Sequence, residues 1–587
     1  MDKPLLILAN GNDKDTINSI SDGFSKKLGK QIDFEITEDS KITGGFIAII
    51  DGKVYDASFE SNLNALADEI SGSDPKSFPD TPNSTFATVG AILKNRAQKA
   101  KSDSAVYEYG EVESFADDIA QIKGLANASY GELLEFDGGA VGLTLDLHIG
   151  GVSAALLGGE VSTSSVVHST GRVASVCVGD ELLGRVIDPI GRPLDGKELK
   201  LDNFMPVESP APTIMDRAPV AAPLETGILA IDSMIPIGRG QRELIIGDRQ
   251  TGKSSIALSA ILNQKDTGVI CVYCAIGQKG STVSSIVHKL EKAGAMGYSV
   301  VVAAMGSDTA AMQYICPYAA CTVAEYFMKK GKDVLVIYDD LSKHAVAYRA
   351  MSLLLRRPSG REAYPGDIFY LHSRLLERAA HIKPELGGGS ITALPIVETM
   401  AGDISAYIPT NVISITDGQI YLESELFNAG IRPAINVGLS VSRVGRAAQH
   451  KAMRDVSGSL RLEVAQYREM AIFAQFGADV DEATAKQLHH GERLMESLKR
   501  PSDELLSLPD QVAILVASSE GLFKDFAIED VYNKKEELLA YLHKNAEPTM
   551  KNIFATKQLS DEDKASLLEQ FKNFSSGTEG APSGEAE

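Results

Sequence analysis

An eight-residue stretch constrains the fold of this chain more than any other part of the sequence. Residues 247–254 are GDRQTGKS, which fits the phosphate-loop pattern G-x-x-x-x-G-K-[ST]. The apolar run at residues 243–246 predicts a strand before the loop, and the run at residues 255–262 predicts a helix after it. A strand, a tight loop and a helix in this order predict an α/β domain with a mostly parallel sheet.

The residue types of this loop suit the phosphates of a nucleotide. Two glycines let the backbone turn so that its N–H groups converge on phosphate oxygens, and the start of the helix adds its positive end. Lys253 is expected between the β- and γ-phosphates, and the hydroxyl of Ser254 is expected to ligate Mg²⁺. The predicted nucleotide-binding residues of the loop are Gly247, Asp248, Arg249, Gln250, Thr251, Gly252, Lys253 and Ser254.

A second apolar run, at residues 334–338, ends in two aspartates. A carboxylate at the carboxyl end of a strand beside a phosphate loop is placed to hold the Mg²⁺ shell, so Asp339 is the second predicted metal residue. Alone, such a run is common, and only the neighbouring loop gives it this meaning. Asp340 could instead cap the helix that follows.

Composition excludes several classes of function. The net charge of −22 repels phosphate backbones and anionic lipid, so nucleic-acid binding and direct lipid binding are not expected. No run approaches the ~20 continuous apolar residues of a membrane span. The N-terminus lacks a secretory signal and the Arg-rich character of a transit peptide. We therefore expect an intracellular, bacterial protein that meets a membrane only through partners.

The five cysteines do not predict a disulfide framework, because their number is odd and they are widely spread. Cys271 and Cys274 form a C-x-x-C pair within an apolar run that predicts a buried strand. Positions i and i+3 of a strand face opposite sides, so the two thiols cannot share one metal ion. We interpret them as core residues.

Apolar runs and turn residues divide the chain into segments. Asp51-Gly52 between two apolar runs predicts a β-hairpin, and the Pro- and Ser-rich stretch at 71–84 predicts a linker. Short alternating runs between glycine pairs then predict a small β-barrel. The predicted segments are an α/β unit at 1–72, a linker at 73–85, a helix at 86–105, the β-barrel at 106–205, the nucleotide-binding α/β domain at 206–446, a helical domain at 447–575 and a disordered tail at 576–587.

Three stretches together resemble a known family. They are the phosphate loop, residues 337–367 and residues 393–445, and they resemble the alpha subunits of F-type ATP synthases. The resemblance covers about residues 106–476 and continues more loosely into the C-terminal helices. It implies a P-loop domain of the RecA-like type, followed along the chain by a C-terminal helical bundle, with bound ATP and Mg²⁺.

The resemblance also implies partners and a place in the cell. Three alpha and three beta subunits alternate in a ring around the gamma rotor shaft, and delta and b subunits form the stator. Proton or sodium flow through a membrane sector drives ATP synthesis from ADP and phosphate. The chain is then expected at the cytoplasmic face of the bacterial cell membrane, bound peripherally through the complex.

One position distinguishes a regulatory subunit from a catalytic one within this resemblance. The beta subunit has a glutamate after the strand that corresponds to residues 269–276, and this glutamate acts on the attacking water. Here Gln278 is an amide, which cannot accept a proton at neutral pH. We expect bound Mg-ATP that turns over very slowly. The alternative, in which another carboxylate substitutes, stays open.

The run SVSR at residues 440–443 matches the contribution of alpha subunits to a neighbour's catalysis. In the family, the arginine reaches across the interface into the beta subunit's site and stabilises transition-state charge. The resemblance therefore makes Arg443 and Ser440 the predicted catalytic residues, acting in trans. By position alone, a surface salt bridge would be the interpretation of Arg443.

Two further residues and one departure concern the chain's own nucleotide. Phe427 and Arg432 match family positions near it, and Ser254 stands where threonine is usual. The family has a glutamine-containing loop beside the adenine, whereas residues 499–504 are KRPSDE. This departure leaves the base contacts open.

The segment at residues 24–66 resembles the C-terminal part of the ATP synthase delta subunit, called OSCP in mitochondria. In that family a hairpin follows a GG pair and a helix ends the chain. Covalent linkage would make the contact between delta and alpha intramolecular. The alternative is an unrelated extension that folds as a small α/β unit.

Two other functions compete with the synthase subunit. A self-sufficient hexameric ring ATPase, such as an export motor or an RNA helicase, would need a water-activating carboxylate and, for RNA, a basic pore. Gln278 and the net charge of −22 argue against this class. A paralogue that serves as an assembly or storage form stays open.

Overall fold

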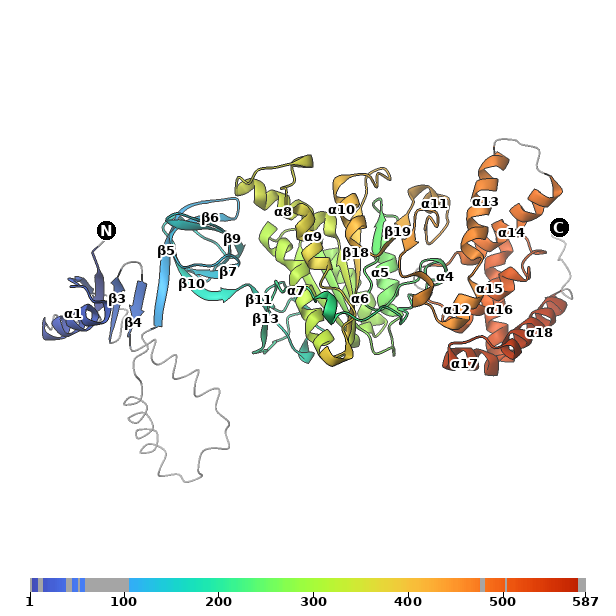
Figure 1. Ribbon diagram of the computed structural model, residues 1–587, viewed down its shortest axis with the longest axis horizontal. Helices are drawn as coiled ribbons and strands as arrows, with labels where there is room; N and C mark the ends of the chain where they lie inside the picture. The colour runs from blue at the N-terminus through green and yellow to red at the C-terminus, as the bar shows by residue number, and fades with distance from the viewer. Residues whose placement is uncertain are drawn as a thin grey trace, which may run out of the picture. The chain divides into compact units, whose positions relative to one another are not determined.

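The computed structural model describes residues 3–8, 14–38, 45–50, 53–58, 105–475, 481–501 and 504–578 (Figure 1). These residues form two compact units, Met1–Ala174 and Ser175–Glu587. The predicted linker at 73–85 lies outside the described residues. So does the predicted helix at 86–105, except that Ala105 is the first residue of a strand.

The N-terminal part of the first unit is a small sheet covered by one helix. β1 runs parallel to β2 and antiparallel to β3, and β3 pairs with β4 in an antiparallel register that joins Ile50 to Lys53. This register agrees with the predicted hairpin, whose two turn residues lie outside the described ones. Phe24 of the helix packs on the buried side chains of Leu6 and Tyr55. The elements are β1 (Leu5–Leu8), α1 (Lys14–Leu28), β2 (Glu35–Glu38), β3 (Phe46–Ile50) and β4 (Lys53–Asp56).

The rest of the first unit is a closed β-barrel. Its strands follow the order β5-β6-β9-β8-β7-β10, and β10 pairs with β5 to close the ring. Residues 105–108 of β5 also pair with β4. Ile122, Leu134 and Val167 are completely or almost completely buried inside. The strands are β5 (Ala105–Ala116), β6 (Ile119–Gly124), β7 (Glu132–Phe136), β8 (Val141–His148), β9 (Gly151–Gly158) and β10 (Val166–Val173).

The barrel strands end earlier than the predicted barrel segment at 106–205. The strand that begins at Ser175 pairs outside the barrel, and the next strand, at residues 186–187, joins the edge of the nucleotide-binding sheet. The short glycine-punctuated runs at residues 175–205 carry the same pattern as barrel strands, so sequence alone assigned them to the barrel. The predicted fold classes themselves, a barrel, a parallel-sheet domain and a helical domain, are confirmed.

The nucleotide-binding domain is built on an eight-stranded sheet of order β12-β16-β15-β17-β18-β14-β19-β20. All its pairs are parallel except β19 with β20. The elements are β11 (Ser175–Cys177), β12 (Val186–Ile187), β13 (Phe204–Pro206), α4 (Leu229–Met234), β14 (Leu244–Gly247), α5 (Lys253–Leu262), β15 (Ile270–Gln278), α6 (Gly280–Lys292), β16 (Ser299–Met305), α7 (Ala310–Lys329), β17 (Asp333–Asp339), α8 (Leu341–Leu354), α9 (Ile368–Leu376), β18 (Ser390–Glu398), α10 (Tyr407–Ile415), β19 (Gly418–Leu422), α11 (Ser424–Asn428) and β20 (Val441–Ser442).

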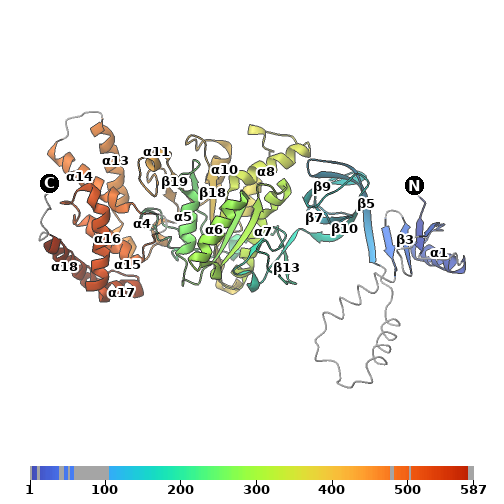
Figure 2. The same cartoon turned by 180° about the vertical axis from the view of Figure 1, so that it is seen from behind.

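Helices pack on both faces of this sheet (Figure 2). Cys271 belongs to the apolar cluster that includes α5 and α6, whereas the Sγ atom of Cys274 lies 3.6 Å from that of Cys316 in α7. The two cysteines of the C-x-x-C pair therefore point to opposite faces, as the strand alternation predicted. The parallel order brings the carboxyl ends of β14, β15, β17 and β18 to one edge, where the phosphate loop lies.

The C-terminal part of the second unit is helical. Its elements are α12 (Lys451–Val456), α13 (Leu460–Gln475), α14 (Glu482–Leu498), α15 (Leu508–Ser519), α16 (Ile528–Asn545), α17 (Glu547–Thr556) and α18 (Asp561–Thr578). One buried apolar cluster joins these helices to the sheet and includes Ile245 of β14 and Phe571 of α18. α18 extends three residues into the predicted tail at 576–587, whose remaining residues lie outside the described part. No helix in the described ranges is long and apolar enough to cross a bilayer.

Candidate functional site

The phosphate loop turns sharply between β14 and α5. Gly252, which precedes the helix, has a φ of 97°, and Gln250 has a φ of 63°. Both values lie in the left-handed region, which costs glycine little. The Thr251 hydroxyl donates to the backbone oxygen of Asp248 at 2.8 Å and closes the turn from inside.

Lys253 lies inside this turn. Its side chain is buried, and its ammonium donates to the backbone oxygens of Gly247 at 2.9 Å and Asp248 at 2.5 Å. Burial lowers the pKa of Lys253, and the carboxylates of Glu398 and Asp340 oppose that shift. The ammonium is thus held within the loop, at the place where phosphate oxygens would meet the backbone N–H groups.

Asp248 braces the loop against two other connections of the sheet. Its carboxylate accepts hydrogen bonds from the Thr399 hydroxyl at 2.6 Å, the Ser424 hydroxyl at 2.9 Å and the backbone N–H of Gly402 at 2.9 Å. Burial acts to raise the pKa of Asp248, but these hydrogen bonds outweigh it and lower the pKa. Asp248 therefore fixes the loop's position, and its carboxylate is not free to face an anion.

Ser254 and Asp339 meet across the loop, as the Mg²⁺ prediction requires. The Ser254 hydroxyl donates to Oδ2 of Asp339 at 2.8 Å, and the Tyr273 hydroxyl donates to the same oxygen at 2.5 Å. The hydroxyl and the carboxylate lie next to each other, and both offer hard oxygen ligands. Mg²⁺ prefers such ligands, together with phosphate oxygens and water. These residues fit the ion, and Mg²⁺ bound there would neutralise charge on the phosphates.

Asp340 has the other role considered for it. Its carboxylate accepts from the backbone N–H of Lys343 at 2.7 Å and caps α8. Burial raises the pKa of Asp340 to about 6, although Lys343 acts in the opposite direction. The two neighbouring aspartates thus have separate tasks, one at the metal position and one at a helix start.

Gln278, at the end of β15, faces the same carboxylate. Its Nε2 donates to Oδ1 of Asp339 at 3.0 Å and contacts the backbone oxygen of that residue at 3.3 Å. One carboxylate that could substitute for the missing base is Glu398 at the end of β18, which interacts electrostatically with Lys253. Glu398 is ion-paired with Arg249 at 2.9 Å. The side chain of Gln278 therefore orients Asp339, and the candidate substitute is already paired.

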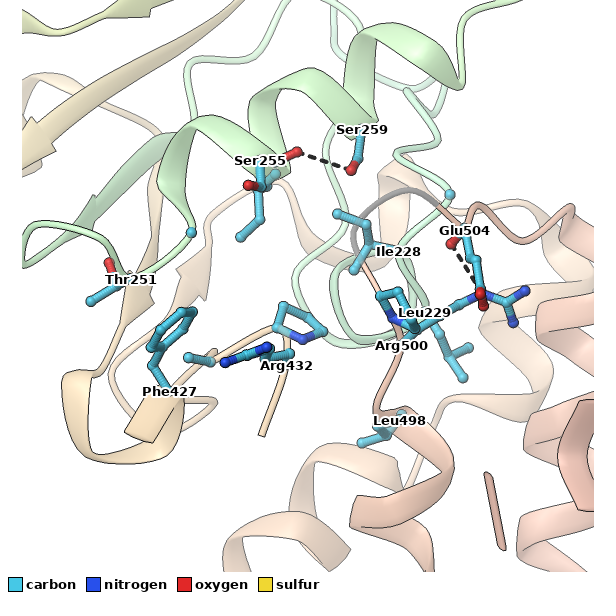
Figure 3. A pocket seen from close by; sticks show the side chains of 16 residues that line it. Ile228, Leu229, Thr251, Ser255, Ser259, Phe427, Arg432, Leu498, Arg500 and Glu504 are labelled. Atoms are coloured by element: carbon cyan, nitrogen blue, oxygen red, sulfur yellow. Dashed lines mark hydrogen bonds and ion pairs between the residues drawn. The ribbon is translucent and has the colours of Figure 1, made fainter. Parts of the chain in front are cut away.

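A cavity adjoins the phosphate loop (Figure 3). It encloses roughly 640 Å³, part of it open to solvent. The guanidinium of Arg432 lies over the Phe427 ring, 4.7 Å from its centre. The two predicted residues thus form a cation–π pair beside Thr251. The residues that line the cavity are Gly227, Ile228, Leu229, Thr251, Gly252, Ser255, Ile256, Ser259, Phe427, Arg432, Pro433, Ala434, Leu498, Arg500, Pro501 and Glu504.

The stretch without the expected glutamines forms one wall of this cavity. The backbone N–H of Arg500 donates to the backbone oxygen of Arg432 at 2.8 Å. The Arg500 guanidinium donates to the backbone oxygen of Glu504 at 3.0 Å and to the Glu536 carboxylate at 3.1 Å. Arg500 is thus anchored by its neighbours at the position where base contacts were left open.

Arg443 does not join the phosphate site. It follows β20 at the edge of the sheet, separated from β14 by β19, and its side chain is exposed. Its backbone N–H donates to the oxygen of Asp417 at 2.8 Å. Within the described residues its guanidinium makes no hydrogen bond or ion pair, so the salt bridge that position alone suggested is not formed.

Ser440 lies in the interior of the domain, just before β20. It is completely buried, its hydroxyl donates to the oxygen of Asn436 at 2.6 Å, and it accepts from the backbone N–H of Tyr421 at 2.9 Å. A buried hydroxyl with both roles satisfied holds the segment before Arg443. The catalytic role predicted for Ser440 stays a prediction, and the run of matching residues around it carried no sign of its burial.

Sequence reasoning missed the side chains that hold the loop from a distance. Thr399 and Ser424 lie about 150 or more residues after Asp248, and no local pattern marks them. Tyr273 could have been found from the alternation of β15, because it faces the same side as α5. Sequence reasoning noted the stretch at residues 499–504 only because the expected glutamines are absent from it.

The sequence is similar to known families over most of its length. The nucleotide-binding domain of the ATP synthase alpha/beta family matches residues 227–442, and the C-terminal domain of ATP synthase alpha/beta chains matches residues 449–574. The ATP synthase delta (OSCP) subunit family matches residues 7–70.

Two relatives named ATP synthase subunit alpha are each 56% identical to the chain. The protein of Acetivibrio thermocellus aligns over 492 residues, which cover 83% of this chain and 97% of the relative. The protein of Caldanaerobacter subterraneus subsp. tengcongensis aligns over 493 residues, with 83% and 97% covered.

Proposed function

The chain belongs to the alpha subunit family of ATP synthases, and we propose that it is the non-catalytic, regulatory nucleotide-binding subunit of a rotary complex that makes ATP. It binds ATP with Mg²⁺ at the phosphate loop, through Lys253, Ser254 and Asp339. The base of the nucleotide occupies the cavity beside Phe427 and Arg432.

The observation that carries the non-catalytic role is the contact between Gln278 and Asp339. The amide donates to the carboxylate at 3.0 Å, so its N–H side is turned to the metal position. An amide accepts no proton at neutral pH, and a missing water-activating group costs orders of magnitude in turnover. The loop therefore binds and holds nucleotide without consuming it.

The test is turnover of the purified chain and of its Gln278→Glu variant. The unmodified chain is expected to bind ATP at one site per chain while hydrolysing it very slowly, and Gln278→Glu is expected to raise hydrolysis. Gln278→Ala is the matched control, because it removes the amide without adding a proton acceptor. Rapid hydrolysis by the unmodified chain would overturn the proposal. If that hydrolysis then disappeared in the Glu398→Gln variant, Glu398 would be identified as the substitute base.

The exposed guanidinium of Arg443 supports a role in trans. It lies at a sheet edge away from the chain's own loop, and it forms no hydrogen bond or ion pair with the described side chains. In the proposed ring of alternating alpha and beta subunits, Arg443 reaches the nucleotide of the neighbouring beta subunit and stabilises charge in the transition state. Ser440 contributes by holding the segment before it.

The remaining partners follow from the family. The ring surrounds a gamma shaft, delta and b subunits form the stator, and a proton or sodium gradient drives synthesis at the cytoplasmic face of the cell membrane. Copurification tests this assembly, because the chain should elute with a beta-type subunit in equal amounts. Elution as a homohexamer with its own ATPase activity would favour a self-sufficient ring ATPase.

The N-terminal unit matches the delta (OSCP) family, which supports a stator role for it. Linkage in one chain makes the contact between the two parts intramolecular and raises its effective concentration. Deleting residues 1–80 is expected to leave ATP hydrolysis by the complex intact while ion pumping falls. Equal pumping by the shortened complex would show that the unit is not part of the stator.

A further inference from the structure

A buried carboxyl group lies behind the segment that carries Arg443. Glu243, just before β14, is completely buried, and its Oε2 accepts from Nε2 of Gln241 at 2.7 Å. Its Oε1 has no hydrogen-bond partner within the described residues. Because a buried carboxyl oxygen without a partner is costly, Glu243 calls for a role beyond packing.

The backbone of Gly418 brings this carboxyl group next to the strand pair that holds Arg443. Gly418 begins β19 and lies opposite Ser442 of β20. A Cβ atom at Gly418 would lie 2.4 Å from Oε2 and 2.8 Å from Oε1 of Glu243, and 2.2 Å from the backbone oxygen of Val441. Only glycine fits there, so the carboxyl group rests directly against the backbone of this pair.

Hydrogen bonds connect Glu243 to the residue before Arg443. Nε2 of Gln241, the donor to Glu243, also lies 3.3 Å from the Ser442 hydroxyl. That hydroxyl donates to the oxygen of Pro236 at 2.7 Å and accepts from the N–H of Gly445 at 3.1 Å. The backbone on both sides of Arg443 is therefore fixed to the cluster that Glu243 belongs to.

The charges around Glu243 also single out Arg443. Burial raises the pKa of Glu243 well above its ordinary value, the carboxylate of Asp417 raises it further, and Gln241 and the positive charge of Arg443 lower it. Asp417 is already paired with Arg242 at 2.9 Å. Arg443 is thus the cation near Glu243 that has no ion pair of its own in the described part of the chain.

We propose that Glu243 is a positioning residue for Arg443. Its carboxyl group, in contact with Gly418 and Gln241, fixes the orientation from which the guanidinium leaves the sheet edge toward a neighbouring subunit's nucleotide. The inference rests on the trans role of Arg443 given under the proposed function, and it adds the residue that sets the geometry of that role.

The first experiment uses Glu243→Gln in the complex assembled with its catalytic partner subunit. The variant keeps the side chain's shape and removes its acidity. Turnover at saturating ATP is expected to fall by about 10- to 100-fold, because a displacement of about 1 Å at a reacting centre costs that much. Affinity for ADP with fluoroaluminate, a transition-state analogue, falls in parallel, while affinity for Mg-ADP stays unchanged.

The second experiment separates positioning from general damage. In the background of Arg443→Ala, Glu243→Gln is expected to cause no further loss of turnover, because its effect passes through the arginine. Glu325→Gln is the matched control: it changes another buried acid of the same domain, one that pairs with Arg378 at 2.7 Å. Any loss caused by Glu325→Gln should multiply with that of Arg443→Ala.

Each other outcome has a definite meaning. Losses from Glu243→Gln and Arg443→Ala that multiply, or equal losses of affinity for Mg-ADP and the analogue, overturn the inference. Normal turnover of Arg443→Ala overturns the proposed trans role, whereas an inactive Arg443→Ala beside a normal Glu243→Gln overturns only the inference. If Glu243→Gln does not assemble, Ser442→Ala, which cuts the contact with Gln241, takes its place, and normal turnover of that variant also overturns the inference.

Discussion

The phosphate loop and the β19–β20 edge differ in how their charged groups are satisfied. At the loop, Lys253 and Asp339 are buried and hydrogen-bonded to neighbours that fix them. At the edge, Arg443 is exposed, and in the described residues only its backbone is held. The buried groups of the loop are arranged to act within this chain, whereas the exposed guanidinium of Arg443 is accessible to another molecule.

One chain carries both regions, and the proposed function gives them different tasks. The loop has the groups that would bind a nucleotide, but the amide of Gln278 beside Asp339 cannot accept the proton that hydrolysis releases. The edge presents the positive charge of Arg443, which the proposed function assigns to a neighbouring subunit's site. If the proposed function holds, the two regions belong to different nucleotide sites, and changes in one should leave the other intact.

The largest expected effect comes from the edge. Arg443→Lys in the assembled complex should lower steady-state turnover by about 10³-fold or more, because lysine lacks the planar fork of guanidinium. Nucleotide binding by the chain's own loop should not change, as measured by titration of the purified chain. Turnover close to that of the unmodified complex would remove the distinction between the two regions.

The next effect comes from the loop. Lys253→Ala should weaken ATP binding by the purified chain about 10- to 100-fold, the range expected for a lost charge-assisted hydrogen bond to phosphate. Calorimetric titration measures it, with Lys265→Ala, an exposed lysine just after α5, as the control. An equal loss in both variants would mean that the loop acts only through general charge.

Asp339→Asn changes the predicted Mg²⁺ position at the phosphate loop. The Mg²⁺ concentration needed for half-maximal ATP binding should rise about 10- to 100-fold, as is usual when a residue that holds or orients a metal is lost. ATP binding without Mg²⁺ should change little. An unaltered Mg²⁺ requirement would show that Ser254 and Asp339 hold each other and not the ion.

The smallest expected effect is on the stability of the fold, and it concerns neither the phosphate loop nor the β19–β20 edge. Glu225, in the second unit, has a pKa raised to about 7 by burial, with Asp232 adding to the shift and Lys557 opposing it. Its contact with His450 at 3.6 Å is no ion pair at neutral pH, because burial lowers the pKa of His450 to about 4.

The sign follows from the direction of that shift. A carboxyl group whose pKa is higher in the folded state stabilises the fold below about pH 4.5 and loses that contribution as pH rises through about 7. Glu225→Gln should therefore be more stable than the unmodified chain at pH 8 by roughly 1–2 kcal/mol, allowing for solvent screening of a partly exposed group. Urea denaturation at pH 5 and pH 8 measures it, and a gain at pH 5 as large as at pH 8 would contradict it.

The sequence predicts what depends on neighbours along the chain. The loop, its flanking strand and helix, and the helix cap at Asp340 follow from local patterns of apolar residues and capping groups. The brace of Asp248 by Thr399 and Ser424 could not be predicted, because it joins residues far apart in sequence whose types are common everywhere.

The burial of Ser440 could not be predicted for the same physical reason. A serine beside an exposed arginine has the right chemistry for a reacting group, and only the tertiary fold shows that its hydroxyl is buried between Asn436 and Tyr421. Glu243 illustrates the converse, because its position next to an apolar strand gave no sign that its carboxyl group lies against Gly418.

One apolar cluster runs from Ile245, behind the phosphate loop, to Phe571 in α18. It couples the thermal stability of the helical domain to that of the phosphate loop. Elements that share one core melt together, so a ligand that binds only the folded loop raises the melting temperature of both. Amide exchange in α15 and α16 should therefore slow when ATP is added, although neither helix carries the phosphate loop. The stability of the C-terminal helices would then report how much of the phosphate loop is occupied by nucleotide.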